Sequence, residues 1–484
     1  MAAFANKFRI RAPFSLLSAE ERRRIHDAAL DVMENVGIRV HSDTARDALR
    51  DAGATVQQDG LVVRFPPELV RYLISRVPHE IVLAGRSREF DLPLDGSHSY
   101  YTTDGCGISV WDAATGSRRP SVLEDIRRTA ILSDALPYVG IYEPTVVAHD
   151  VPEKMHVVKG VRVAMENTSK HILSESTSTP DEARAQVRMA AEVVGGQEVL
   201  MRRHYMSAMV CTISPLVLDG RTTDAAMVWA ESRVPVHITG MAQTGISGPA
   251  TLAGDLVVNH AETLALACAI QAHVPGAPCL YGSVLSSMDP MTGAYMGGSP
   301  ESTILCGAAV EMGKHCKMPT STGGLGSGAK TPGTRASLEN ALSAAMCAVC
   351  GGEVVNGLGV LDGSTLLSYE QLLWDHEIAG MTVRMFKGID VDDASLALDL
   401  VKKVGIGGSY LSQRHTAQQL RGFYLPNAWA SVSQASHGHG DAEDQMKAAG
   451  AKVESILKGH VPEPLDRDTA KRLDGVVDDF AGSR

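Results

Sequence analysis

Hydrophobic and polar positions follow a regular alternation through the middle of the chain. From about residue 98 to residue 388, short continuous apolar runs alternate with amphipathic helical patterns. Apolar strands that alternate with helices are typical of a parallel sheet buried on both faces. We count eight such runs, which predict a (β/α)8 TIM barrel, with a doubly wound sheet as the alternative. The runs are "SYYTTDG", "YVGIYEPTVV", "HILSES", "YMSAMVC", "VPVHITG", "CLYGSV", "MPTSTGG" and "VVNGLGVLDG".

The segment before the barrel has a different pattern. "LSAEERRRIHDAALDVMENVGI" predicts a helix that begins with a capping box formed by Ser18 and Glu21. Its apolar positions, from Ile25 to Val36, fall on one helical face. Further on, "LVVRF", "PPELVRYLISRVP" and "EIVLAG" indicate a strand, a helix and a strand. We therefore predict an α+β N-terminal domain over residues 1–97.

After the barrel the alternation stops. The stretch from Gly407 to Asp441 is polar and aromatic, and "AEDQMKAAGAKVESILKGH" then predicts a further helix. We expect residues 389–484 to form a helical C-terminal extension that packs near the barrel mouth. In this segment Tyr410 and His415 are candidates to close over the mouth.

Composition and charge narrow the class of protein. The formal net charge is -11, which argues against non-specific binding of nucleic acid, whose phosphates attract Lys/Arg patches. No run of about 18 apolar residues is present, so no membrane span is expected. The basic start lacks the apolar core of a signal peptide, although a transit peptide remains an alternative. The eight cysteines are scattered, mostly in apolar runs, which indicates thiols in a reducing cytoplasm.

The glycine-rich stretch "TSTGGLGSGAKTPG", residues 320–333, nearly matches a phosphate-binding P-loop. Gly324 starts the required spacing and Lys330 ends it, but Ala329 replaces the second glycine. In the predicted barrel the stretch follows the seventh strand, on the face where barrel active sites lie. Nucleotide binding, a plain connection and a glycine floor beneath a large ligand are the three interpretations.

Several side chains at predicted strand ends could recognise a cation. Tyr101, Tyr142 and Tyr281 offer aromatic faces, although each could equally be a packed barrel residue. Glu143 and Glu175 follow the second and third strands. Because carboxylates are rarely buried unpaired, these two predict either a cation partner or a salt bridge.

Other polar side chains leave alternatives open. His237, inside the fifth strand, is either a satisfied core residue or a donor to a substrate carboxylate. Asp104 ends the first strand and is equally suited to a turn. His437, His439 and Asp441 lie close together in sequence and suggest a metal, with a polar loop as the alternative. No tightly bound metal is expected.

Longer composite patterns identify a family. The chain resembles the trimethylamine methyltransferase (MttB-like) superfamily of corrinoid-dependent methyltransferases over nearly its whole length. The patterns that carry the resemblance are "IHDAALDVMENVGIRV", "LRDAGATV", "VRFPPELVRYLISRVP", "LAGRSREFDL", "GAKTPGTRASLENALSAAMCAVCGGEVVNGLGVL", "LWDHEIAGMTVRMFKGI" and "VGIGGSYLSQRHT". The family fold is a (β/α)8 barrel, in agreement with the alternation described above.

The resemblance implies a methyltransferase that moves a methyl group from a methylated amine to the cobalt of a corrinoid (cobalamin) carried by a separate protein. The archetype has a pyrrolysine near the position of Gly326 to Lys330, where this chain has standard residues. Members without pyrrolysine resemble quaternary amine demethylases that act on betaine-type compounds. The resemblance therefore implies a small quaternary amine as substrate. The loop expected to face the corrinoid comprises Gly323, Gly324, Gly326, Ser327 and Gly328.

Two other functions are kept as alternatives. A barrel lyase would need a Schiff-base lysine at a strand end, and neither Lys170 nor Lys330 is well placed for this role. A catalytically idle barrel that binds quaternary amines is the second. We expect a cytoplasmic protein whose partners are a corrinoid protein and a small amine, and a homo-oligomer is left open.

Overall fold

The computed structural model describes residues 14–57, 60–105, 107–175, 178–426 and 442–482. Eight parallel strands close into a barrel in the order β10-β11-β13-β14-β17-β18-β6-β9, which confirms the predicted (β/α)8 fold and excludes the doubly wound sheet. Each strand coincides with one of the eight apolar runs. The strands are β6 (Tyr100–Thr103), β9 (Val139–Tyr142), β10 (His171–Ser174), β11 (Met206–Cys211), β13 (Val236–Gly240), β14 (Cys279–Ser283), β17 (Thr320–Gly323) and β18 (Val354–Leu358).

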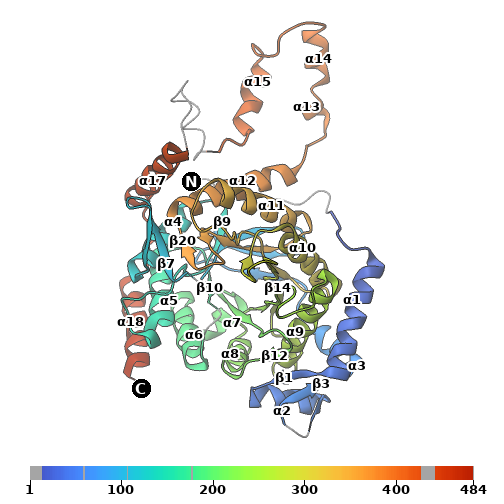
Figure 1. Ribbon diagram of the computed structural model, residues 1–484. Helices are drawn as coiled ribbons and strands as arrows, with labels where there is room; N and C mark the ends of the chain where they lie inside the picture. Colours follow the sequence, from blue (N-terminus) through green and yellow to red (C-terminus); the bar gives the residue numbers. More distant parts are fainter. Residues whose placement is uncertain (1–13, 58–59, 106, 176–177, 427–441, 483–484) are drawn as a thin grey trace.

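Helices surround the barrel, and their starts follow the capping chemistry of the sequence (Figure 1). Thr179 caps α6 with Pro180 at the first position, and Ser299 and Pro300 do the same for α10. At the start of α4, the Asp125 carboxylate accepts a hydrogen bond from the backbone amide of Val122. The barrel helices are α4 (Leu123–Ala135), α5 (His156–Asn167), α6 (Pro180–Val194), α8 (Gly220–Glu231), α9 (Leu252–His273), α10 (Pro300–His315), α11 (Thr334–Val349) and α12 (Tyr369–Lys387).

The N-terminal segment packs on one side of the barrel. The helices α1 (Ala19–Asp31), α2 (Asp43–Ala52) and α3 (Pro67–Ile74) all contact α9. The strands β1 (Ile38–Val40), β2 (Thr55–Val56) and β3 (Val62–Arg64) form a sheet that β12 (Val217–Leu218), from the barrel segment, completes. The predicted capping box of α1 is present, but the helix ends in a π-helical turn, η1 (Val32–Val36). This wider turn rotates the face, so Met33 is buried while Val36 is exposed.

A hairpin of β4 (Ile81–Leu83) and β5 (Leu92–Leu94) closes the barrel at its amino-terminal end. Its apolar side chains pack in one buried cluster with residues near the starts of barrel strands, among them Tyr100, Leu280 and Val354. The amino-terminal end of the barrel is therefore filled by apolar side chains. Any site open to solvent is expected at the opposite, carboxyl-terminal end.

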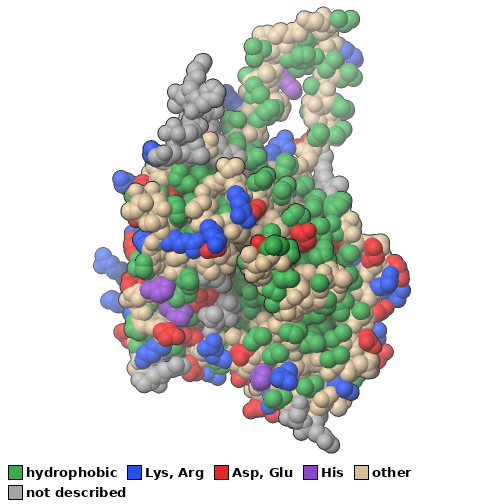
Figure 2. Space-filling view, viewed as in Figure 1, with side chains coloured by type: hydrophobic (Ala, Val, Ile, Leu, Met, Phe, Trp, Pro, Cys, Tyr) green, Lys and Arg blue, Asp and Glu red, His purple; other side chains and the backbone are tan. Residues whose placement is uncertain are grey.

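The C-terminal segment is helical, as predicted. The helix α17 (Ala442–Gly459) packs on α12 and α4, and α18 (Arg467–Gly482) packs on α6 and α5. An arm that projects from the body lies between α12 and α17 in the sequence (Figure 1). It consists of α13 (Asp393–Leu396), α14 (Leu398–Val404) and α15 (Arg414–Gln419). Figure 2 shows hydrophobic side chains along this arm. No helix of the described residues is long and apolar enough to cross a membrane.

A small sheet stands beside the carboxyl-terminal end of the barrel. Its strands are β7 (Ser109–Asp112), β8 (Ser117–Pro120), β19 (Val360–Leu361) and β20 (Leu366–Leu367), in the order β19-β20-β7-β8. They come from the segments that follow β6 and β18. The sheet therefore joins the first and the last barrel units at the functional end.

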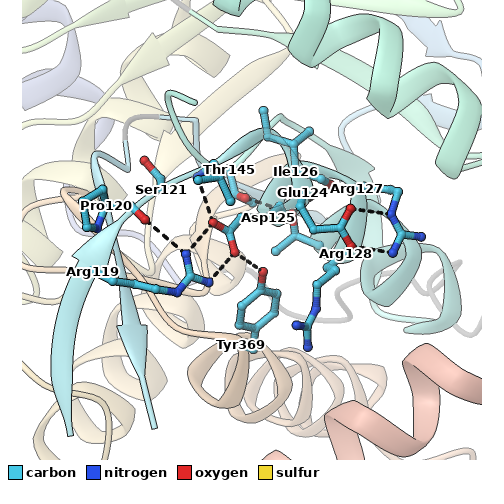
Figure 3. A network of polar contacts seen from close by, with 12 residues as sticks. Arg119, Pro120, Ser121, Glu124, Asp125, Ile126, Arg127, Arg128, Thr145 and Tyr369 are labelled. Carbon is cyan, nitrogen blue, oxygen red and sulfur yellow. Dashed lines mark hydrogen bonds and ion pairs between the residues drawn. The ribbon is translucent and has the colours of Figure 1, made fainter. Parts of the chain in front are cut away.

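A buried polar network fixes this sheet to the helices (Figure 3). The Arg119 guanidinium donates two hydrogen bonds, of 2.6 and 2.8 Å, to the carboxylate of Asp125, and the Tyr369 hydroxyl donates a third of 2.6 Å. Burial raises the pKa of Asp125, but these donors outweigh it and hold the pKa below the usual value. The guanidinium carbon of Arg128 lies 5.0 Å from the centre of the Tyr369 ring. The network ties β8 to the starts of α4 and α12.

Candidate functional site

A cavity of about 490 Å³ opens at the carboxyl-terminal ends of the barrel strands. This is the end at which barrel enzymes place their active sites. The hairpin of β15 (Ser287–Met288) and β16 (Tyr295–Met296), the turn between β19 and β20, and residues of α10 and α11 contribute further parts of its wall. The lining residues are Asp104, Met209, Cys211, Met241, Val284, Leu285, Tyr295, Gly297, Gly298, Ser302, Thr303, Cys306, Gly323, Gly324, Gly326, Ser343, Asn356, Gly357, Asp362, Gly363, Ser364 and Thr365.

The glycine loop predicted to face a large ligand forms part of this wall. Gly323, Gly324 and Gly326 line the cavity. Ser327 and Gly328 lie behind it, where the Ser327 hydroxyl and the Gly328 amide both donate hydrogen bonds to Glu339, at 2.6 and 3.2 Å. The loop is therefore fastened to α11 from behind while three of its glycines face the cavity.

Two of the cavity-lining glycines, Gly324 and Gly326, differ in the space around them. A Cβ on Gly324 would lie 2.5 Å from Cγ1 of Val355, whereas the nearest atom to a Cβ on Gly326 would be the Tyr295 hydroxyl at 3.8 Å. Neither glycine has a positive φ angle. Close packing requires glycine at position 324, whereas position 326 has room for a Cβ.

The backbone of the loop does not suit a phosphate group. The amides of Gly324 and Leu325 donate to the carbonyl of Asn356, and the amide of Gly328 donates to that of Gly297. These N–H groups, which would cradle phosphate in a P-loop, already have protein acceptors. Lys330, moreover, is exposed. The geometry does not support the nucleotide interpretation.

A buried carboxyl group adjoins the cavity. Glu143 follows β9, is 1% exposed, and its Oε2 has no hydrogen-bond partner among the described residues. Burial, followed by the neighbouring carboxylates of Asp104 and Glu175, raises the pKa of Glu143 well above the usual value. Asp104 lines the cavity and accepts a 2.6 Å hydrogen bond from the Ser364 hydroxyl. A cation placed here would relieve the repulsion between these acidic groups.

Glu175 differs from Glu143 because it has a charged partner. Oε1 of Glu175 lies 3.4 Å from Nε2 of His156, at the start of α5. The interaction with Glu175 raises the pKa of His156 to about 9. The predicted salt bridge is thus present at Glu175, with a histidine as the cation.

The three candidate tyrosines lie in the layer between the barrel and its helices, and none lines the cavity. The Tyr142 hydroxyl donates to the carbonyl of Ile126 in α4, at 2.9 Å. The Tyr281 hydroxyl lies 2.9 Å from Nδ1 of His260 in α9. Tyr101 is fully buried in the same hydrophobic core. Their contacts are those of packed barrel residues, because strand alternation turns the three rings outward.

His237 lies inside the barrel. It pairs in register with Met209, which lines the cavity, and its Nδ1 is 3.1 Å from the Ser321 hydroxyl. Nε2 has no hydrogen-bond partner among the described residues. Burial, aided by His171, lowers the pKa of His237 to about 3, so the ring is neutral. The placement keeps both the core role and the substrate role open.

Sequence reasoning missed several lining residues. Tyr295 lies in the β15–β16 hairpin, Met209 lies within β11 and Met241 directly follows β13, and a methionine at such positions resembles any core residue. Asn356 lies in the middle of β18, and its Oδ1 lacks a partner among the described residues. The polar residue in the apolar run "VVNGLG" was a usable signal for Asn356. The hairpin tyrosine has no comparable signal.

A strained turn forms another part of the wall. Asp362, Gly363 and Ser364 all have positive φ angles, of 52°, 63° and 67°. For residues other than glycine this conformation costs free energy and is typical of functional sites. Arg118 holds the turn through a 2.8 Å ion pair with Asp362.

The remaining candidates lie away from the cavity or outside the described residues. Lys170 is buried, with its Nζ donating to the carbonyls of Ser133 and Leu136, and no lysine is found among the described cavity residues. Tyr410 and His415 belong to the projecting arm and do not line the cavity. The seven described cysteines are free thiols. The predicted metal loop of His437, His439 and Asp441 lies outside the described residues.

Comparisons with known proteins agree on one family. A family model described as trimethylamine methyltransferase (MTTB) matches residues 3–480. A trimethylamine methyltransferase MttB of Desulfitobacterium hafniense (strain DSM 10664 / DCB-2) is 30% identical over 471 residues, which cover 96% of this chain and 93% of that protein. A glycine betaine methyltransferase of Desulfitobacterium hafniense (strain Y51) is 28% identical over 467 residues, 96% of each chain. The crystal structure of the monomethylamine methyltransferase MtmB of Methanosarcina barkeri shares the fold, with a TM-score of 0.56 at 11% identity, over 98% of this chain and 89% of that one.

Proposed function

Because the chain belongs to the trimethylamine methyltransferase (MTTB) family, we propose that it transfers a methyl group from a small quaternary amine of the betaine type to a corrinoid carried by a separate protein. The relative named glycine betaine methyltransferase and the absence of any non-standard residue in the glycine loop support this substrate class. The observation that carries the proposal is the buried Glu143, whose Oε2 has no hydrogen-bond partner among the described residues, beside Asp104 in the wall of a largely apolar cavity.

The proposed reaction does not require the protein to transfer a proton. A quaternary ammonium loses a methyl group to leave a neutral tertiary amine, so no general acid is needed. Bound corrinoid would supply the cobalt(I) nucleophile that accepts the methyl group. Charge disperses as the new bond forms, and a dry pocket favours this transition state. The chain must therefore bind the cation, exclude water and hold the methyl carbon in line for attack.

The cavity residues match these tasks. Glu143 and Asp104 supply negative charge for the ammonium group, and arrival of the cation stabilises the ionised form of Glu143. Met209, Met241 and Leu285 present apolar surface to the methyl groups. The amide of Asn356 is our candidate for the anionic end of a betaine.

The glycine side of the cavity fits the approach of a large planar group. Gly297, Gly298, Gly323, Gly324 and Gly326 line this side, where Tyr295 is the neighbouring large side chain. At Gly326 an added Cβ would meet no atom closer than the Tyr295 hydroxyl at 3.8 Å, so the wall is not closely packed there. These glycines are the residues we assign to the approach of the methyl acceptor.

Titration calorimetry with three compounds tests the substrate class. We expect glycine betaine to bind, and its isostere with carbon in place of nitrogen to bind at least about thirtyfold more weakly, or about 2 kcal/mol, because the buried carboxyl groups would then face a neutral group. Trimethylamine, which lacks the anionic end, should bind more weakly than betaine. Equal binding of the isostere, or a preference for trimethylamine, contradicts the proposal.

An activity measurement tests the transfer itself. The protein is mixed with a betaine and free cobalamin reduced to cobalt(I), and methylcobalamin is followed by absorbance. Formation that depends on both protein and betaine supports the methyltransferase. Betaine binding without methylcobalamin, also with corrinoid protein present, would instead indicate an idle amine-binding barrel.

A further inference from the structure

Three metal-ligating side chains from separate elements meet on the outside of the barrel. His26 comes from α1, His260 from α9, and Cys316 directly follows α10. Nδ1 of His26 lies 2.9 Å from Nε2 of His260, and Sγ of Cys316 lies 4.0 Å from the same Nε2. One ligand atom of each side chain lies within 4.8 Å of the others. We infer that His26, His260 and Cys316 bind a zinc-like divalent transition-metal ion that ties the N-terminal helix to the barrel.

The spacing suits a tetrahedral ion after small adjustments. Bonds of about 2.0–2.1 Å to nitrogen and 2.3 Å to sulfur place two nitrogens about 3.3 Å apart, and nitrogen and sulfur about 3.6 Å apart. The two distances given above differ from these values by about 0.4 Å each, a change that rotation of the half-buried His26 and Cys316 side chains supplies. The mixed nitrogen and sulfur donors select zinc or cobalt over magnesium and calcium, which require oxygen ligands.

A hydrogen bond to its other ring nitrogen fixes the orientation of His260, the ligand between the other two. The Tyr281 hydroxyl lies 2.9 Å from Nδ1 of His260, and the Asn259 amide donates to that hydroxyl at 3.3 Å. With Nδ1 engaged, Nε2 of His260 points to His26 and Cys316. A ligating histidine commonly has its other ring nitrogen fixed in this way. The Tyr281 side chain, which faces outward from the barrel, would therefore also hold His260 in the orientation that a metal ion requires.

Protonation states also suit the two histidines. Burial lowers the pKa of His26 to about 4 and that of His260 well below the usual value, so both rings are neutral and can donate a lone pair. Burial raises the pKa of the Cys316 thiol to about 12, so binding must release its proton. His315, whose ring centre is 5.2 Å from that of His26, is exposed and stands beside the outer side of the cluster. Water or His315 would complete the fourth position.

The test uses metal-free full-length protein titrated with Co²⁺ and, separately, with Zn²⁺. Co²⁺ should bind at one ion per chain with the charge-transfer absorption of a cobalt–thiolate bond, and Zn²⁺ should displace it. Zn²⁺ should also raise the Tm, because an ion that binds only the folded state stabilises it. The variants Cys316→Ser and His26→Gln should each bind more than about 100-fold more weakly, and Tyr281→Phe about 10–100-fold more weakly.

Matched controls make the result specific. Cys350→Ser changes another buried cysteine, and His273→Gln changes another histidine of α9, so both should bind like the unchanged chain. Alkylation of Cys316, read by mass spectrometry, should slow when Zn²⁺ is present. Three results would overturn the inference: no stoichiometric binding, Co²⁺ spectra without thiolate absorption, or affinities unaffected by Cys316→Ser and His26→Gln.

Discussion

The two sides of the mouth cavity are built on opposite principles. On one side, Asp104 lines the cavity, and the carboxyl groups of Glu143 and Glu175 lie beside it; Glu175 forms an ion pair with His156. On the other side, glycines remove side chains altogether, and backbone hydrogen bonds hold the wall in place. The acidic side is specific for charge and the glycine side is specific for shape. We interpret the first as the place of the substrate cation and the second as the place where the methyl acceptor approaches.

The largest effect is expected from Glu143→Gln on the acidic side, because this substitution removes the charge of the Glu143 side chain and keeps its shape. Loss of one partner of a buried ion pair costs about 3–5 kcal/mol, so kcat/KM for a betaine should fall by about two to four orders of magnitude. Methylcobalamin formation measures the effect. Glu182→Gln, at a buried Glu that caps α6, serves as the control and should keep its rate. Near-normal kcat/KM in Glu143→Gln would remove the carboxyl group from our model of the site.

The glycine side is tested by a pair of variants, Gly326→Val and Gly324→Val. At position 326 a Cβ meets no atom closer than 3.8 Å, so the branched side chain should displace the acceptor, with a loss on the order of 100-fold in transfer rate and little change in Tm. At position 324 the added atoms collide with Val355, so the Tm itself should fall. Rate assays with a corrinoid protein and thermal melts measure both. If Gly326→Val keeps full rate, this side is a plain wall.

The raised pKa of Glu143 should also make the stability of the protein depend on pH. Because the folded pKa of Glu143 is raised, its contribution to stability is complete below the usual Glu value and is lost as pH rises through the folded pKa. The Tm of the unchanged chain should therefore decline with rising pH more than that of Glu143→Gln. Melts from about pH 5 to pH 8 measure the difference. Parallel curves would show that Glu143 is not the source.

The smallest effect is expected at the outward tyrosines. Tyr142→Phe removes the hydrogen bond to Ile126 and should cost about 0.5–1.5 kcal/mol of stability. The KM for a betaine should change less than about twofold, because the hydroxyl faces α4 rather than the cavity. Denaturant unfolding and steady-state kinetics separate the two. A large rise in KM with unchanged stability would place Tyr142 at the substrate after all.

The barrel could be predicted from sequence because each strand is a local apolar run with turn residues at its end. The site could be predicted only in part. Glu143 and the glycine loop follow strands directly, so their place at the mouth follows from chain order. Which way a side chain faces depends on register, and the outward Tyr142 directly precedes Glu143, which lies beside the cavity residue Asp104. Tyr295 comes from a hairpin, and His26 and His260 are 234 residues apart, so no local pattern could bring them together.

The N-terminal helices have a consequence for how the molecule unfolds. Ala29 and Leu49, from α1 and α2, belong to the same continuous apolar core as Leu264 of α9 and Tyr142 of the barrel. Separating the first 97 residues from the rest would expose this shared surface on both pieces. The segment therefore differs from a module joined by a linker, because it cannot melt or be exchanged on its own. Heat or denaturant should release both parts in one cooperative step, and neither part is expected to be a stable fragment.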